Sequence, residues 1–442
     1  MSTQKTGSSS LKRKNQQRRR DRSSSAGTIA ESHSLQRQRN IRRIKAQYVN
    51  DVNNANQDIP PNILDTYYTA VLNENSRNLD ALDRTEILRQ VRVKADRFRQ
   101  AERQMLNPLL DNNNQVLRNE SRNLIRNVLK DYLANNPDKI NDTSAAGIKK
   151  VRIEIQNRFK LFRQTASILT NGILTPSDLQ ALGISSTPSS DVHFNTSDSV
   201  SFFDINVNRG NANIDPGFAS VGVAVERRND MQKHINTLKK YARLGRASAI
   251  RDIQQFLDDL RNSTSPLPPP VTSLLQKLPT NVDQNTSDRT VDALNNSLIG
   301  GLFRAHLANT PAVRGQLEGR AGRSVMFVSQ GPTLNLSTHG GLQALGGSGI
   351  QELRTNQSMP AGDITDVILP NSMRVFNNAI LNVNPNVNLT FVGNRRGTVP
   401  YFDAASGTRA NIPMNVPDFQ GAIDNFIATG NGRLITHISN IN

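Results

Sequence analysis

The chain has 442 residues, of which 36% are hydrophobic, and its formal net charge is +17 at pH 7. It contains no cysteine, which excludes disulfides, thiolate metal sites and cysteine nucleophiles. No apolar run approaches the roughly 18 residues that a membrane-spanning helix needs, so we expect no membrane partner.

Most of the positive charge lies in the first fifty residues. They contain 13 lysines and arginines against Asp21 and Glu31, a net of +11, which leaves +6 (17 − 11) for the remaining 392 residues. Ser, Gln and Asn fill the gaps, so we expect residues 1–50 to form a disordered basic arm that binds polyanions. The expected nucleic-acid-binding residues are Lys12, Arg13, Lys14, Arg18, Arg19, Arg20, Arg22, Arg37, Arg39, Arg42, Arg43 and Lys45.

The spacing of these cations, one to four residues apart, suits irregular contact with the phosphates of DNA or RNA rather than the reading of base edges. The clusters at 12–14 and 18–20 are also typical of a nuclear-import signal. A tail that only keeps the protein soluble remains the alternative interpretation.

A linker over 51–62 and a mainly helical domain over 63–262 are expected next. Apolar residues at three- and four-residue steps predict helices over 79–106 and 115–134, and a third stripe runs from Ile148 to Leu169. Three such helices with short connections suit a small bundle. Thr175-Pro176-Ser177-Asp178 predicts a helix start, and Gly183 can end that helix.

A short β segment interrupts the helical pattern, with strands expected over 200–207 and 221–225. A helix over 229–261 follows, with a kink or break near Gly245 because glycine disfavours helix by about 1 kcal/mol. Its first half carries a possible secondary basic face, formed by Lys233, Lys239, Lys240, Arg243 and Arg246. A phosphate-facing surface and a solvated face are equally good interpretations of it.

Residues 263–271 contain Pro266, Pro268, Pro269 and Pro270 and are predicted to be a stiff linker between domains. A boundary between 175 and 200 is the alternative. The remainder, 272–442, is predicted to be an α+β domain. It has an expected helix over 287–308 with a weak point at Gly300-Gly301, and another helix over 416–428. Strands are expected over 324–328, 364–369, 387–392 and 433–438, between Gly, Pro and Asn turns. The fold class is therefore α+β.

Recognisable catalytic motifs are missing from the sequence. The glycine clusters do not match a phosphate-binding loop, and the six histidines are far apart. We therefore expect no enzyme activity, no cofactor and no metal site. Among the functions that we consider, a nucleic-acid-processing enzyme ranks third.

A basic disordered arm, a helical region and an Asn- and Gly-rich domain that contains strands resemble viral capsid or nucleocapsid proteins at the level of the class. The resemblance implies a virion location, with the host nucleus or cytoplasm during assembly, self-association as a homo-oligomer, contact with other virion proteins and packaged nucleic acid on the arm. A chromatin- or RNA-associated protein that forms no shell is the alternative.

Overall fold

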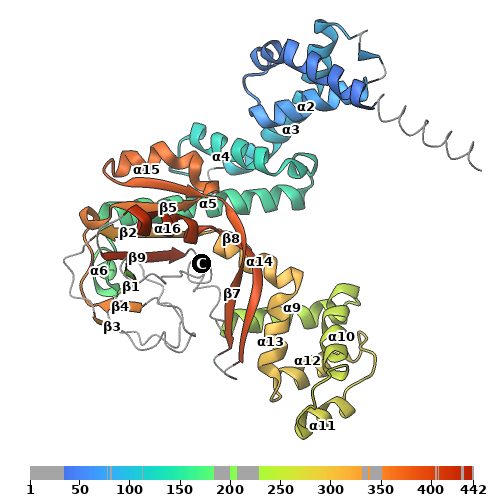
Figure 1. Cartoon of the computed structure of the whole chain (residues 1–442), viewed down its shortest axis with the longest axis vertical. Helices are drawn as coiled ribbons and strands as arrows, with labels where there is room; N and C mark the ends of the chain where they lie inside the picture. The colour runs from blue at the N-terminus through green and yellow to red at the C-terminus, as the bar shows by residue number, and fades with distance from the viewer. Residues whose placement is uncertain are drawn as a thin grey trace, which may run out of the picture. The chain divides into compact units, whose positions relative to one another are not determined.

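The computed structural model describes residues 34–76, 78–79, 82–111, 113–183, 200–206, 228–330, 337–338, 351–403, 406, 408–429 and 433–440. The fold is α+β, as the sequence predicts. Two compact units divide the chain, Met1–Ile155 (unit 1) and Gln156–Asn442 (unit 2) (Figure 1).

Unit 1 is helical throughout its described residues. It contains a helix over 34–55, α2 (Pro61–Glu74), α3 (Arg84–Leu109), α4 (Arg122–Asn135), the short η2 (Pro137–Asn141) and the first part of α5 (Ala145–Asn171). Asp83 and Ser121 cap α3 and α4 by accepting a hydrogen bond from the backbone N–H three residues on. The stripe predicted for the first helix is buried in α3, at Val91, Ala95, Phe98 and Met105. Two further helices, the one over 34–55 and α2, belong to unit 1, and the third predicted helix, α5, continues past residue 155 into unit 2.

The amino-terminal part of unit 1 differs from the prediction of a disordered arm to residue 50 and a linker over 51–62. Residues 34–55 are helical, and Pro61 begins α2, where proline suits the first turn. The physical reason is a stripe of Ile41, Ile44, Tyr48 and Val52, spaced at three or four residues, of which Ile44 and Val52 are buried. Residues 1–33 lie outside the described part of the chain.

Unit 2 is built around a sheet. Among the described residues, seven strands pair in the order β3-β4-β1-β9-β2-β5-β6, and only β5 and β6 are parallel neighbours. The strands are β1 (Val200–Asn206), β2 (Ser324–Gln330), β3 (Ser337–Thr338), β4 (Gln351–Thr355), β5 (Asp366–Pro370), β6 (Asn388–Val392) and β9 (Arg433–Asn440). Strands β2, β5, β6 and β9 correspond to the four strands expected after residue 320. Figure 1 shows β9 running between β1 and β2.

The strand β1 lies where the sequence predicts a strand but belongs to a different domain from the one expected. It pairs with β4 and β9 instead of lying within a helical domain over 63–262. Its Phe202 is fully buried, and a lone strand offers no surface that could bury it. The second strand expected there, over 221–225, lies outside the described residues.

A helical layer and a hairpin form the other part of unit 2. The helices are α9 (Arg228–Arg243), α10 (Ala247–Arg261), α11 (Pro269–Lys277), α12 (Ser287–Asn295), α13 (Gly300–Asn309) and α14 (Pro311–Ala321), and the hairpin is β7 (Asn394–Asp403) with β8 (Thr408–Pro417). One hydrophobic cluster joins them, from Met231 of α9 through Phe256 and Phe303 to Ile412 of β8.

The predicted break at Gly245 is confirmed, since this residue has a φ of +69°. The helix expected over 287–308 is two helices, α12 and α13, with Gly300 at the start of the second.

The proline-rich segment is not a boundary between compact units. Pro269 and Pro270 form the first turn of α11, with Pro268 as the residue before it, and Val271 is buried in the hydrophobic cluster just named. Proline suits the first turn of a helix because its missing N–H has no intrahelical partner there. The division at Ile155 and Gln156 therefore replaces the expected division at 263–271.

Among the described residues, five further short helical elements belong to unit 2. They are α6 (Pro176–Ala181), η4 (Ala361–Asp363), η5 (Asn371–Phe376), α15 (Asn377–Val383) and α16 (Phe419–Thr429). The predicted start of α6 is confirmed, because the Thr175 side chain accepts a hydrogen bond from the Asp178 N–H. Gly183 follows that helix with a φ of +68°. Phe376 stacks on Phe162 of α5, with ring centroids 4.8 Å apart.

Candidate nucleic-acid interface

The helix over 34–55 is attached to the rest of unit 1 by buried and polar contacts on one side. The Tyr68 hydroxyl of α2 donates a hydrogen bond to the Ile44 carbonyl at 2.8 Å, and both residues are buried. Lys45 pairs with Asp65 at 2.6 Å and donates to the Thr69 hydroxyl at 2.8 Å. These contacts hold the middle of the helix in place, so its outer side presents a defined surface.

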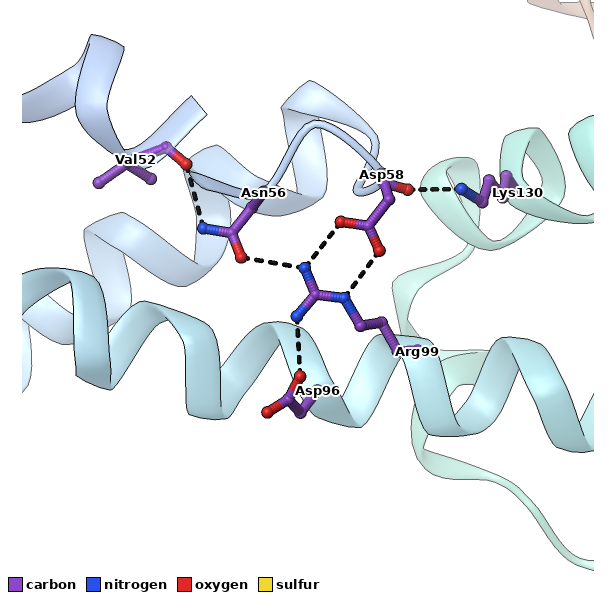
Figure 2. Close-up of polar contacts among 6 residues, drawn as sticks. All are labelled: Val52, Asn56, Asp58, Asp96, Arg99 and Lys130. Carbon is purple, nitrogen blue, oxygen red and sulfur yellow. Dashed lines mark hydrogen bonds and ion pairs between the residues drawn. The ribbon is translucent and has the colours of Figure 1, made fainter. Parts of the chain in front are cut away.

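The turn that follows this helix is held by a polar network around Arg99 of α3. The Arg99 guanidinium binds the carboxylate of Asp58, and its Nη2 also donates to the Asn56 side chain at 3.1 Å. Asn56 in turn donates to the Val52 carbonyl at 3.0 Å, and Lys130 donates to the Asp58 carbonyl at 2.5 Å. Figure 2 shows the side chains of Asn56, Asp58 and Asp96 arranged around the guanidinium, with Val52 and Lys130 bound to Asn56 and Asp58 farther out. The network holds the turn between the helix over 34–55 and α2 against α3.

The outer side of the helix carries the predicted cations. Arg39, Arg42 and Arg43 are exposed and are spaced three and four residues apart, which places them on one side of a helix. We call these three residues the arginine face. Within the described residues, Arg39 and Arg42 have no ion-pair partner, and the same holds for exposed Arg37 in the first turn. Lys45, also predicted to contact nucleic acid, instead forms an ion pair with Asp65.

The remaining predicted arm residues lie outside the described part of the chain. They are Lys12, Arg13, Lys14, Arg18, Arg19, Arg20 and Arg22. They precede the arginine face in sequence, and residues 23–36, which contain no lysine or arginine, separate the two groups within one basic run. The sequence signal that predicts a helix at the end of this run is the stripe Ile41, Ile44, Tyr48 and Val52, which the surrounding Arg, Gln and Asn residues obscure.

The second predicted basic face is partly neutralised by contacts within unit 2. Lys239 binds both carboxylate oxygens of Asp292 at 2.7–2.8 Å, and Arg243 pairs with Asp288 at 3.1 Å, so α9 directs two of its five cations to α12. The Arg246 guanidinium lies over the Tyr241 ring at 4.2 Å. Lys233 and Lys240 are exposed. The structure therefore does not bring the five cations together as one open surface.

The described residues offer no metal cluster and no membrane-spanning helix. Across the ranges given above, no three acidic or histidine side chains come together as a possible metal site. None of the described helices has a stretch long and apolar enough to cross a bilayer. Comparison with known proteins gives no family model, no curated protein and no solved structure that matches the chain, so any functional conclusion rests on these residues alone.

Proposed function

We propose that this chain is a structural protein of a virion, a capsid, nucleocapsid or core protein, that binds packaged nucleic acid non-specifically through its basic amino-terminal segment. The observation that carries the binding proposal is the arginine face, where Arg39 and Arg42 stand exposed without ion-pair partners among the described residues. Eight further lysines and arginines precede it in residues 1–33. A polyanion is the chemical partner that such a segment fits.

Electrostatics within the helix supports a phosphate partner. Like charges three or four residues apart destabilise a helix by about 0.2–0.5 kcal/mol per pair, and Arg39 and Arg42 form such a pair. The nearest acidic residue of the same helix, Asp51, is already paired with Arg84 at 2.7 Å. A nucleic-acid backbone supplies negative charges from outside and relieves this repulsion, while the counterions that it releases add to the affinity.

The same features favour binding without sequence preference. Guanidinium groups on the outer side of a helix can each contact a phosphate, but sequence reading needs side chains held at fixed base edges in a groove. The cations before residue 34 are irregularly spaced and interspersed with Ser and Gln. We expect DNA and RNA of equal length to compete within about 10-fold of each other.

Self-association is the second part of the proposal. The 392 residues after the first fifty carry +6, so copies of the chain repel one another mainly through their amino-terminal segments. Nucleic acid neutralises those segments and lets the bodies approach. This charge distribution supports assembly that depends on polyanion, as expected of a shell or core protein.

The binding proposal is tested with full-length variants that change charge equally. Arg39→Gln/Arg42→Gln/Arg43→Gln removes the arginine face, and Arg92→Gln/Arg97→Gln/Arg103→Gln removes three exposed arginines of α3 as the matched control. Affinity for a single-stranded oligonucleotide is measured across salt. The first variant should lower the magnitude of the slope of log affinity against log salt by about 2, since each lost phosphate contact contributes ~0.7. Equal slopes for the two variants would contradict the proposal.

The alternative is a chromatin- or RNA-associated protein that forms no shell. Light scattering of the full chain with and without nucleic acid separates the two functions. A shell or core protein grows into large closed particles of narrow size distribution when nucleic acid is added. The alternative protein stays small at every ratio of protein to nucleic acid.

A further inference from the structure

A cavity of about 340 Å³ lies in unit 2 between α14 and the hairpin of β7 and β8. Arg314 and Glu318 line it from α14, Arg396 from β7, and Met414 and Asn415 from β8. Its volume is at the lower end of the range for ligand pockets, about 300–1,000 Å³. None of these residues belongs to the predicted basic arm or to the predicted basic face of α9.

The two arginines of this cavity are not used by the fold. Within the described residues, neither the Arg314 nor the Arg396 guanidinium has an ion-pair or hydrogen-bond partner. The neighbouring Arg395 behaves differently, because it pairs with Asp418 at 3.4 Å. Successive residues of a strand point to opposite sides, so Arg395 and Arg396 lie on opposite faces of the hairpin. Both residues line the cavity, and an anion bound there would be stabilised by their positive charges.

With its single carboxylate, the cavity has a net positive charge that matches the single negative charge of one phosphodiester. Glu318 accepts a hydrogen bond from the Asn415 backbone N–H at 2.8 Å, which holds one of its oxygens against β8. Two arginines and one glutamate give the lining side chains a net charge of +1. A backbone phosphodiester carries a single negative charge, and guanidinium groups bind phosphate oxygens through two parallel hydrogen bonds.

Space for the ligand is open at the helix side of the cavity. A Cβ atom added to Gly315 would meet no atom within 4 Å. A larger side chain at this position would therefore enter the cavity without disturbing the packing of α14. Gly315 thus offers a way to block the cavity while both arginines stay in place.

We propose that the cavity between α14 and the hairpin is a second nucleic-acid contact, in which Arg314 and Arg396 bind a backbone phosphate of single-stranded nucleic acid. The inference rests on the proposed function for the identity of the ligand and names a contact in the folded body. It gives bound nucleic acid a fixed position on unit 2.

Hydrogen exchange of the full chain, followed by mass spectrometry, tests the site. The probes are a short single-stranded oligonucleotide and inorganic phosphate, each compared with chloride at equal ionic strength. We expect the oligonucleotide to slow exchange in peptides that cover 311–318 and 394–417. Arg314→Gln/Arg396→Gln and, separately, Gly315→Leu should abolish this protection, and Arg395→Gln should retain it. Affinity for the cavity should fall by about 10-fold or more in the double variant, the scale of losing charge-assisted hydrogen bonds.

Three results would overturn the inference. They are no protection of these peptides in the wild-type chain, equal protection in Arg314→Gln/Arg396→Gln, and protection by inorganic phosphate without protection by the oligonucleotide. The amino-terminal cations are intact in all of these variants. Failure of this inference therefore leaves the overall affinity for nucleic acid unchanged, whereas failure of the proposed function removes that affinity in every chain.

Discussion

The guanidinium of Arg99 binds the carboxylate of Asp58 through two parallel hydrogen bonds, from Nε to Oδ2 and from Nη2 to Oδ1, each of 2.7 Å. The Arg99 side chain is 17% exposed and that of Asp58 is 45% exposed. A third donor, Nη1, binds Asp96 at 2.7 Å. This pair joins the middle of α3 to the turn between the helix over 34–55 and α2 (Figure 2).

Arg99→Ala should therefore destabilise unit 1. Solvent reaches Asp58, which weakens the pair. We therefore expect Arg99→Ala to lower the free energy of unfolding by about 1–2 kcal/mol, measured by urea denaturation followed by circular dichroism. Arg89→Ala is the control, since Arg89 forms a similar pair with Glu86 at the surface of the same helix. A loss in Arg89→Ala as large as that in Arg99→Ala would show that the network around Asp58 has no special role.

The same pair predicts a dependence of stability on pH. The hydrogen bonds from Arg99 are the largest cause that holds the pKa of Asp58 below its ordinary value of 3.8. A carboxylate with a lowered pKa in the folded state adds stability above its unfolded pKa and loses it as pH falls through the folded pKa. The difference in unfolding free energy between the wild type and Asp58→Asn should thus be constant above about pH 5 and shrink below about pH 4. A difference that stays constant down to pH 2 would contradict this assignment.

Tyr68→Phe should loosen the helix that carries the arginine face. The change removes the hydrogen bond from the Tyr68 hydroxyl to the Ile44 carbonyl and should cost about 1 kcal/mol. Burial also raises the pKa of Tyr68 to about 12, so its hydroxyl stays protonated at neutral pH and donates this bond. Tyr67→Phe is the matched control, because the Tyr67 hydroxyl has no hydrogen-bond partner in the described residues. Exchange rates of the amides in 40–52 should rise in the first variant and stay unchanged in the second.

Truncation should separate the fold of unit 1 from its charge. A chain that lacks residues 1–33 loses eight lysines and arginines, yet keeps Ile44, Lys45 and every contact described for the helix over 34–55. A chain that lacks residues 1–45 loses buried Ile44 and the acceptor of the Tyr68 hydrogen bond, which should cost about 3 kcal/mol or more. Thermal unfolding followed by circular dichroism should be unchanged by the first deletion and lowered by the second. Identical unfolding of both chains would mean that the helix contributes nothing to unit 1.

Gly172→Ala should destabilise unit 2. Gly172 follows α5 with a φ of +89°, and an added Cβ would lie 2.1 Å from the Met359 carbonyl oxygen. Both the unfavourable backbone conformation and the clash oppose the change, so we expect a loss of about 2 kcal/mol or more in unfolding free energy. Gly319→Ala within α14 is the control, because its added Cβ meets no atom within 4 Å and alanine favours helix. The control should be neutral or slightly stabilising in the same urea titration.

Local signals explain which elements the sequence predicts well. Thr175 before Pro176, glycine at 183 and the break at Gly245 are local backbone chemistry, and each appears in the structure where expected. The hairpin of β7 and β8 was missed because its strands contain Asn, Arg, Gly and Pro, which disfavour strands. Its stability comes from burial of Ile412, Met414 and Val416 against helices far away in the sequence.

Long-range pairing explains what the sequence could not predict in the candidate sites. Hydrophobic periodicity does not reveal that β1 pairs with β4 and β9, so the expected domain boundaries were misplaced. The charge of the amino-terminal segment is visible in the sequence, but the ion pairs that occupy Lys45, Lys239 and Arg243 are not. Arg314 and Arg396 are 82 residues apart (396 − 314), so only the folded hairpin brings them to one cavity.

The position of β9 between β1 and β2 sets an order of events during protein synthesis. The sheet of unit 2 cannot acquire its central strand until residues 433–440 have left the ribosome. Between β1 and β9 the ribosome must add residues 207–432, which takes about 10–45 s at ~5–20 residues per second. Unit 1 has no such requirement, because every contact described for it lies within the first 155 residues. The arginine face can therefore be in place on a nascent chain, and open to a polyanion, well before unit 2 completes its sheet.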